Sequence, residues 1–162
     1  MNLLVIGSLN IDLVIKTERQ PKSGETIRGT DFVTVCGGKG GNQAIAAAKL
    51  GADVSMIGNV GDDDFGNMLV GNLKDEHIKV SGISKSEVSS GVAVINVFGN
   101  DNTIIVNSGA NGMLNRHHID KCKQMIMQCD AVLMQFEIPL ETVIYAAKTA
   151  KQYGKKVIIN PA

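Results

Sequence analysis

The segment LLVIGSLNID, residues 3–12, begins with a short, continuous apolar run and continues with polar residues. Such a run is typical of a strand buried on both faces of a parallel sheet. Similar runs predict strands at 53–58, 131–136 and 156–160. Between them, the residue patterns predict helices at 42–50, 64–78 with Asp64 as N-cap, 115 to about 128, and 140–154. The alternation predicts an α/β fold with a mostly parallel central sheet.

Two regions interrupt this alternation of strands and helices. Residues 10–36 are rich in threonine, valine and isoleucine and contain the turn PKSGE, and residues 91–106 are typical of a hairpin that turns at GNDN. Both regions alternate with a period of two residues. They predict a small antiparallel sheet that stands apart from the central one.

The composition excludes several classes of protein. The 162 residues suffice for one domain with a core, and 44% hydrophobic and 20% charged residues are normal for a globular protein. Sixteen basic residues balance sixteen acidic ones, so the chain has no overall field to attract nucleic acid or an anionic membrane. No apolar run has the length of a membrane span. We therefore expect neither a nucleic-acid partner nor a membrane partner.

The cysteines indicate the compartment. Cys36, Cys122 and Cys129 are an odd number and contain no C-x-x-C pair. This favours reduced thiols in a cytoplasmic protein over disulfides or a zinc site.

Three polar residues follow predicted strands, where ligands of open α/β sheets bind. Asn10 and Asp12 follow the first strand and point to the same side of an extended segment, an arrangement that suits a ligand with several hydroxyl groups. An Asx turn is the structural alternative. Glu137 follows the strand at 131–136, where it either caps the helix from Leu140 or contacts a ligand.

The glycine-rich stretch VCGGKGGNQAIAAAKLG, residues 35–51, precedes a predicted helix. It fits neither the Walker A motif nor the dinucleotide-binding fingerprint. Its glycines allow backbone N–H groups to approach a ligand, or act as a hinge at 37–38. Lys39 contacts the ligand or faces solvent, and Asn42 caps the helix or binds a hydroxyl. The stretch indicates a loop for a polar small molecule.

Two other groups contain residue types that can bind metals but lack the pattern of a metal site. The aspartates of GDDDFG, residues 61–66, are typical of helix caps rather than of a metal site. His117 and His118 are adjacent near a helix start, so they point in different directions. We therefore expect no metal ligands in this chain.

The last residues, VIINPA, follow directly from what should be a central strand. A parallel strand buried on both faces needs neighbours and covering helices. The sequence therefore predicts that a C-terminal portion is missing, and a naturally short protein is the alternative.

Taken together, the motifs resemble the N-terminal half of the PfkB-type sugar kinases, and most closely the ribokinases. The resemblance covers essentially the whole chain. The matching motifs are GSLNIDLV (7–14), PKSGET (21–26), GGKGGNQA (37–44), the glycine pair Gly51 and Gly61, VGDDDFG (60–66), SGVAVI (90–95), NSGAN (107–111), LMQFEIP (133–139) and NPA (160–162). One departure is Gly41, where ribokinases often have alanine.

The resemblance implies a ribokinase-like three-layer α/β/α fold with a small β-sheet lid, formed here by the segments at about 10–36 and 91–106. It also implies that ATP phosphorylates the 5-hydroxyl of ribose, with Mg²⁺ and activation by a monovalent cation such as K⁺. Lids from two subunits would form a homodimer. Another sugar or nucleoside kinase, or a non-catalytic sugar-binding fragment, are the alternatives.

The resemblance also assigns residues to the sugar site. Asn10 and Asp12, with Ile11 between them, fall on the segment that holds sugar hydroxyls. Gly38, Lys39, Gly40, Gly41 and Asn42 fall on the loop that wraps the sugar. Glu137 is a further substrate contact, and Ala93 and Ile95 are apolar lid positions over the ring.

The family's catalytic base, an aspartate in a GAGD-type motif, is not among these residues, and neither are the N-x-x-E motif and the nucleotide and cation sites. A general base must lie within hydrogen-bond reach of the attacking hydroxyl. We therefore expect the base to lie beyond Ala162 and this chain alone to be inactive.

Overall fold

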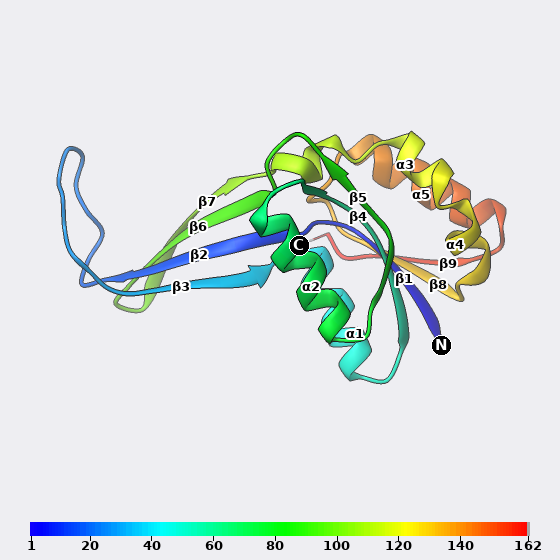
Figure 1. The fold of residues 1–162 in the computed structure, drawn as a ribbon, viewed down its shortest axis with the longest axis horizontal. Helices are drawn as coiled ribbons and strands as arrows, with labels where there is room; N and C mark the ends of the chain where they lie inside the picture. Colours follow the sequence, from blue (N-terminus) through cyan, green and yellow to red (C-terminus); the bar gives the residue numbers. More distant parts are fainter. Residues whose placement is uncertain (162) are drawn as a thin grey trace.

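The computed structural model describes residues 1–161 and contains two sheets (Figure 1). The larger sheet has the order β5-β4-β1-β8-β9, and all of its strand pairs are parallel. Its strands are β1 (Asn2–Ile6), β4 (Asp53–Gly61), β5 (Lys79–Ser86), β8 (Ala131–Met134) and β9 (Lys156–Ile159). The predicted parallel sheet is confirmed.

Helices cover both faces of this sheet. The α-helices of residues 1–161 are α1 (Lys39–Lys49), α2 (Asp64–Asp75), α3 (Arg116–Lys121), α4 (Lys123–Gln128) and α5 (Leu140–Gln152), and a 3₁₀ helix, η1, spans Gly109–Met113. Leu4 and Ile6 of β1 pack in one core with residues of α3, α4 and α5, whereas Leu3 and Val5 pack in a second core with residues of α1 and α2. Successive side chains of a strand point to opposite faces, so one short apolar run supplies both cores of a three-layer α/β/α fold. Within residues 1–161, no helix combines the length and the apolar character needed to cross a lipid bilayer.

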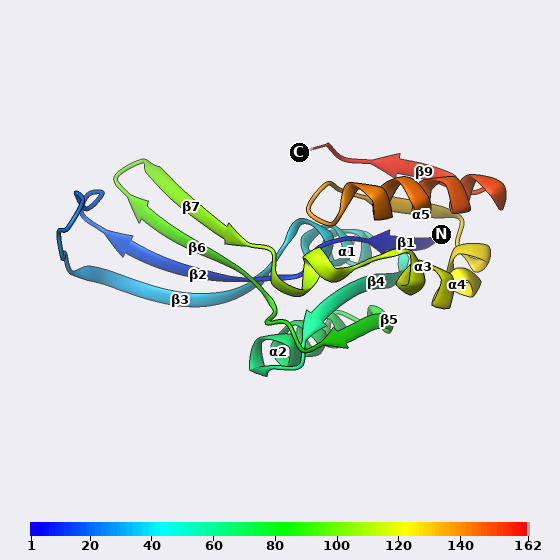
Figure 2. The same ribbon diagram turned by 90° about the horizontal axis from the view of Figure 1, so that it is seen from above.

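The second sheet extends away from the helical layers (Figures 1 and 2). It has the order β3-β2-β6-β7 and is formed by β2 (Asn10–Thr17), β3 (Gly29–Gly37), β6 (Gly91–Phe98) and β7 (Asp101–Asn107). The β2–β3 and β6–β7 pairs are antiparallel, but β2 and β6 are parallel, with Asn10 opposite Gly91. The prediction of a wholly antiparallel sheet is therefore wrong at its centre. Both central strands begin at the junction with the larger sheet and run outward, which makes them parallel.

The structure differs from the sequence-based expectations at three further places. Strand β5 was not predicted, because its sequence KVSGISKS has no continuous apolar run. The helix predicted from 115 to about 128 is two helices, because the Cys122 amide bonds to the Ile119 carbonyl and closes α3 with a tighter i→i−3 turn. The N-cap of α2 is Asp63 rather than Asp64, and its carboxylate accepts the amide of Gly66 at 2.7 Å.

Candidate functional site

Glu137 is the centre of a polar cluster at the carboxyl edge of the larger sheet. The Ser8 hydroxyl, just beyond β1, donates to its Oε2 at 2.6 Å, and the Lys39 amide donates to the same oxygen at 3.1 Å. The Lys39 ammonium forms an ion pair with Oε1 at 2.9 Å. Helix α5 has Pro139 at its N-cap position and no side-chain cap. The interpretation of Glu137 as a helix cap is therefore wrong.

These contacts determine the charge of Glu137. Burial alone would raise the pKa of this carboxyl, but the hydrogen bonds from Ser8 and Lys39 and the positive charge of Lys39 outweigh it. The pKa of Glu137 therefore lies below its ordinary value, and the residue is ionised at neutral pH.

Asp12 is the second carboxylate of the cluster. It lies on β2, on the same face as Asn10, and its side chain lies over Gly37 of the paired strand β3. Burial raises the pKa of Asp12, and the negative charge of Glu137 raises it further. The charges of Asp12 and Glu137 thus interact, and the chain leads from Gly37, beside the Asp12 carboxylate, to Lys39, which pairs with Glu137.

The glycines at the start of α1 allow it to touch the end of β1. Gly38 has φ = 84°, a conformation that favours glycine, and a Cβ on this residue would lie 2.7 Å from the Asn10 amide nitrogen. A Cβ on Gly40 would lie 2.6 Å from the backbone nitrogen and oxygen of Ser8. The glycine loop is therefore packed directly against the segment that carries Asn10.

The first turn of α1 has no backbone amide left for a phosphate. The Lys39 amide bonds to Glu137, the Gly40 amide to the Ser8 hydroxyl, and the Gly41 amide to the Ser8 carbonyl. The next amide, of Asn42, bonds to Gly38. With the Glu137 carboxylate adjacent as well, the site disfavours an anion. This agrees with the sequence, which fits neither phosphate-binding fingerprint.

Asn10 is held in place by Asn111, which the sequence reasoning noted only as part of the NSGAN motif. The Leu9 amide donates to Oδ1 of Asn111 at 2.8 Å, and Nδ2 of Asn111 donates to the Leu9 carbonyl and to Oδ1 of Asn10 at 3.0 and 2.8 Å. Asn111 is almost fully buried. Helix η1 thereby fixes the start of β2.

The remaining predicted site residues lie around this cluster in different ways. Ile11 points to the opposite face of β2 and is fully buried in the core shared with α1 and α2. Asn42 is exposed, and Gly41 is buried against Leu9. Ala93 lies opposite Asp12 in the second sheet, and Ile95 lies two residues further along the same face. The structure thus brings Asp12, Lys39 and Glu137 together, with Ile11 outside the cluster.

Gln135 and Gln43 were missed by the sequence reasoning. Gln135 follows β8, is fully buried, and donates through Nε2 to Oε1 of Gln43 on α1 at 2.6 Å. The available signal was a glutamine inside the apolar stretch AVLMQF, since a buried amide needs a partner.

Two of the three consecutive aspartates, Asp62 and Asp63, are engaged in contacts within the chain. Asp63 accepts hydrogen bonds from the Ser90 amide at 2.8 Å and the Ser90 hydroxyl at 2.7 Å, and Asp62 pairs with Lys85. Within residues 1–161, no three His, Cys, Asp or Glu side chains form a group that could hold a metal ion.

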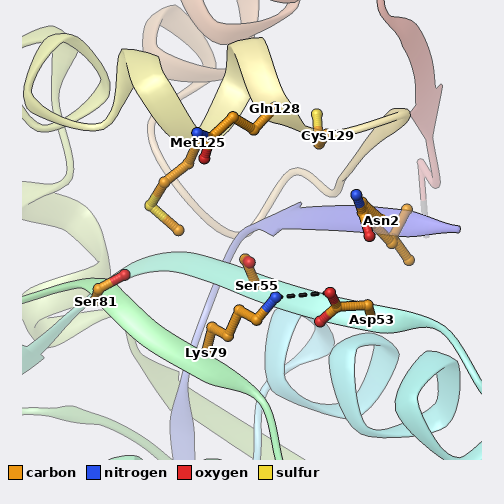
Figure 3. Close-up of a pocket in the computed structure, with 9 residues that line it drawn as sticks. Asn2, Asp53, Ser55, Lys79, Ser81, Met125, Gln128 and Cys129 are labelled. Atoms are coloured by element: carbon orange, nitrogen blue, oxygen red, sulfur yellow. Dashed lines mark hydrogen bonds and ion pairs between the residues drawn. The ribbon is translucent and has the colours of Figure 1, made fainter.

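The larger sheet has one hollow at the amino end of its strands and another at the carboxyl end. A cavity of about 430 Å³ lies at the amino end, where Asn2, Asp53 and Lys79 begin β1, β4 and β5, and the Lys79–Asp53 ion pair of 2.6 Å crosses it (Figure 3). It contains none of the predicted site residues. A hollow of about 280 Å³ at the carboxyl end is lined by Glu137, Phe136 and Ser108, among others. The second hollow adjoins the polar cluster.

The whole chain, residues 1–162, matches the family model described as pfkB family carbohydrate kinase. The chain belongs to the pfkB family of carbohydrate kinases. It is 43% identical over 162 residues to the ribokinase of Bacillus subtilis strain 168. This alignment covers 99% of this chain and 55% of that protein. It is 42% identical over 164 residues to the deoxyribokinase of Salmonella typhi. This alignment covers 100% of this chain and 54% of that protein.

A solved structure supports the same fold in this pfkB family member. The Arabidopsis thaliana ribokinase in complex with ribose and ATP superimposes with a TM-score of 0.90 and 33% identity, over 99% of this chain and 53% of that one. The predicted ribokinase-like fold is confirmed. The chain spans about half the length of the curated relatives that it matches.

Proposed function

We propose that this chain is the sugar-binding half of an ATP-dependent kinase that phosphorylates the 5-hydroxyl of ribose, acting in the cytoplasm. The observation that carries the proposal is the cluster of Asp12, Glu137 and Lys39 at the carboxyl edge of the larger sheet. The names of the relatives support a pentose, and the three cysteines, which form no disulfide within residues 1–161, agree with a cytoplasmic protein.

The charge of the cluster suits a polyhydroxy ligand. Asp12 and Glu137 offer acceptor oxygens, each able to bind more than one hydroxyl, and Lys39 offers N–H donors. The proposed ligand carries no phosphate on arrival, in agreement with the occupied amides of α1. Gly38, Gly40 and Asn42 would shape the loop beside the sugar.

The second sheet serves in this proposal as a lid. Ala93 and Ile95 share a face with Asp12, so an apolar surface lies beside the polar cluster. Such a surface packs against the carbon side of a sugar ring while the carboxylates bind its hydroxyls. A closed lid also excludes water, which strengthens the electrostatic interactions inside.

Two features of the described residues bear on the groups that the family implies for the transfer step. In the described part of the chain, no group of three or more His, Cys, Asp or Glu side chains could hold a metal ion, and the first turn of α1 does not fit a phosphate. Residues 1–161 therefore bind and orient the sugar in this proposal. The phosphoryl transfer, with ATP, Mg²⁺ and K⁺, would depend on groups outside them.

A calorimetric titration of the 162-residue chain with D-ribose tests the sugar site. We expect Asp12→Asn to weaken ribose binding by about tenfold or more, because one acceptor set loses its charge. The matched control is Asp31→Asn, which lies on the same face of the second sheet but opposite Lys16 at its far end. Unchanged ribose affinity in Asp12→Asn removes Asp12 from the site, and the absence of ribose binding by the wild-type chain contradicts the proposal.

2-Deoxyribose is the second candidate substrate, because a deoxyribokinase is nearly as similar to the chain as a ribokinase. The same titration with 2-deoxy-D-ribose decides between them. Tighter binding of the deoxy sugar would identify a deoxyribokinase-type site.

The proposal also includes that the 162-residue chain alone has no kinase activity. A coupled assay with ATP, Mg²⁺, K⁺ and ribose should show no sugar phosphate above the enzyme-free rate. Turnover by the purified 162-residue chain would contradict it.

We also propose that two copies of the chain form a homodimer through the second sheet. On the face that carries Asp12, Val33, Ile104 and Val106 are 51%, 54% and 55% exposed. Exposed apolar surface of this kind marks an interaction site. Sedimentation equilibrium should show a dimer that Ile104→Lys dissociates, and a wild-type chain that remains monomeric at high concentration rules the dimer out.

A further inference from the structure

Two side-chain bridges connect α1 to the segment that follows β8. The Lys39 ammonium pairs with Glu137 at 2.9 Å, and Nε2 of Gln135 donates to Oε1 of Gln43 at 2.6 Å. Lys39 and Gln43 are four residues apart on one face of the helix, and Gln135 and Glu137 are two apart in the chain after β8. The two bridges therefore lie next to each other between the same two segments.

The bridges differ in their surroundings. The side chains of Lys39 and Glu137 are 43% and 27% exposed, so this ion pair is accessible to a ligand. Gln135 is fully buried and fills the space beside Gly7, into which any Cβ on Gly7 would project. The ion pair can exchange partners with solvent or a ligand, whereas the Gln135–Gln43 bond is buried at Gln135 and only partly exposed at Gln43.

Burying Gln135 is unfavourable for stability. Its Oε1 has no hydrogen-bond partner among the described residues, and leaving a buried acceptor unpaired lowers the stability of the fold. Methionine has a similar length and would fill the same space without this cost. What glutamine adds is a directed hydrogen bond to Gln43.

We propose that Gln135 and Gln43 are a positioning pair for the ligand site. Their bond holds the first turn of α1 against the segment after β8. Lys39 and Glu137 then keep their positions when they exchange their ion pair for contacts with a ligand. The identity of that ligand as a sugar rests on the proposed function, whereas the positioning of α1 does not.

The test compares Gln43→Met, which removes the acceptor, with Gln43→Glu, which keeps it. Gln43 is partly exposed, so both side chains fit and a charge is tolerated. Amide hydrogen exchange measured by NMR reports the positioning. We expect Gln43→Met to speed exchange at Lys39 and Gly41 by about tenfold without changing α5, because only the first turn of α1 opens.

A ribose titration of the same samples reports the effect on the site. We expect Gln43→Met to weaken ribose binding by about fivefold, and Gln43→Glu to restore both exchange and affinity to within about twofold of wild type. A contribution to general stability alone would not be restored in this way, and it would speed exchange in α5 as well.

Unchanged exchange at Lys39 and Gly41 in Gln43→Met overturns the proposal, and so does uniform acceleration across the chain. If Gln43→Met does not fold, Gln135→Met removes the same bond from the other side. Failure of that variant to fold would show a role in overall stability and would also overturn the proposal. If the wild-type chain binds no ribose, the sugar proposal fails, while the exchange rates still decide whether the pair positions α1.

Discussion

The five-stranded and four-stranded sheets are built from similar apolar residues but are covered to very different extents. The apolar residues 3–6 of β1 are at most 5% exposed, because helices pack on both faces of that sheet. Ile105 on β7 is 72% exposed, and Phe32 on β3 is 61% exposed. The larger sheet is stabilised within this chain, whereas the second sheet has surface left to bury against something else.

The junction between the sheets shows a second difference. The central strands β2 and β6 begin at fixed points, where Asn111 holds Leu9 and Asp63 holds Ser90. The edge strands β3 and β7 are followed by glycines with positive φ, Gly38 at 84° and Gly109 at 47°. The centre of the second sheet is thus joined to the larger sheet through side-chain hydrogen bonds, and its edges through tightly packed glycines.

The largest effect is expected where α1 meets β1. Gly40→Val should lower the free energy of unfolding by about 3 kcal/mol or more, because its side chain would collide with the Ser8 backbone at the junction. Urea denaturation measures the change. Gly71→Ala on α2 is the control, since nothing lies within 4 Å of its Cβ position. This variant should raise the free energy of unfolding by up to about 1 kcal/mol, because alanine favours a helix more than glycine does. Wild-type stability of Gly40→Val would show that the contact gives way easily.

The next effect tests the fixed start of β2. Asn111→Ala should cost about 2–3 kcal/mol, because it leaves buried backbone groups of Leu9 unpaired. Exchange of the β2 amides should increase with it. Asn107→Ala, at the exposed end of β7, should change stability by less than about 0.5 kcal/mol. Equal losses in the two variants would remove the contrast between the centre and the edges of the second sheet.

A smaller, pH-dependent effect is expected at Glu137. Its folded pKa is lowered, so its charge stabilises the fold above the unfolded value of about 4.5, and this stabilisation is lost as the pH falls through the folded pKa. Glu137→Gln should therefore cost about 1 kcal/mol at pH 7 and less as the pH falls below 4.5. Denaturation at several pH values measures this, with the exposed Glu87→Gln as control. A cost that grows on acidification would contradict the direction of the shift.

The smallest effect compares the two sheets directly. Ile6→Val in β1 should lower the free energy of unfolding by about 1 kcal/mol, since Ile6 is fully buried. Ile105→Val in β7 should lower it by no more than about 0.3 kcal/mol, because Ile105 is largely exposed. Denaturation at a concentration where the chain is monomeric measures both. Similar losses would mean that the face of β7 is already covered in solution.

The three-layer fold could be predicted because its signal is local. Runs such as LLVIG and AVLM are apolar throughout, and this pattern is typical of a strand covered on both sides. Strand β5 lacked the signal, because an edge strand has less surface to bury and tolerates lysine and serine. The parallel pairing of β2 with β6 was not predictable from either segment, because it depends on where both strands leave the larger sheet.

The candidate site could be predicted in part. The rule that ligands bind at the carboxyl ends of strands selected Asp12 and Glu137, which the structure places in one cluster. It could not decide whether Glu137 caps α5, since that depends on Ser8 and Lys39, which are distant in sequence. Gln135 was missed because its partner, Gln43, is 92 residues away.

The parallel pair at the centre of the second sheet also bears on how the chain folds. Asn10 of β2 pairs with Gly91 of β6, so the sheet cannot form from neighbouring segments alone. The β2–β3 hairpin can form early, but it gains its third strand only after more than half of the chain has left the ribosome. During that interval the unpaired edge of β2 is open to other strands. We therefore expect the pairing of β6 with this edge to be a slow step of folding. Aggregation of the nascent chain should begin at the same edge.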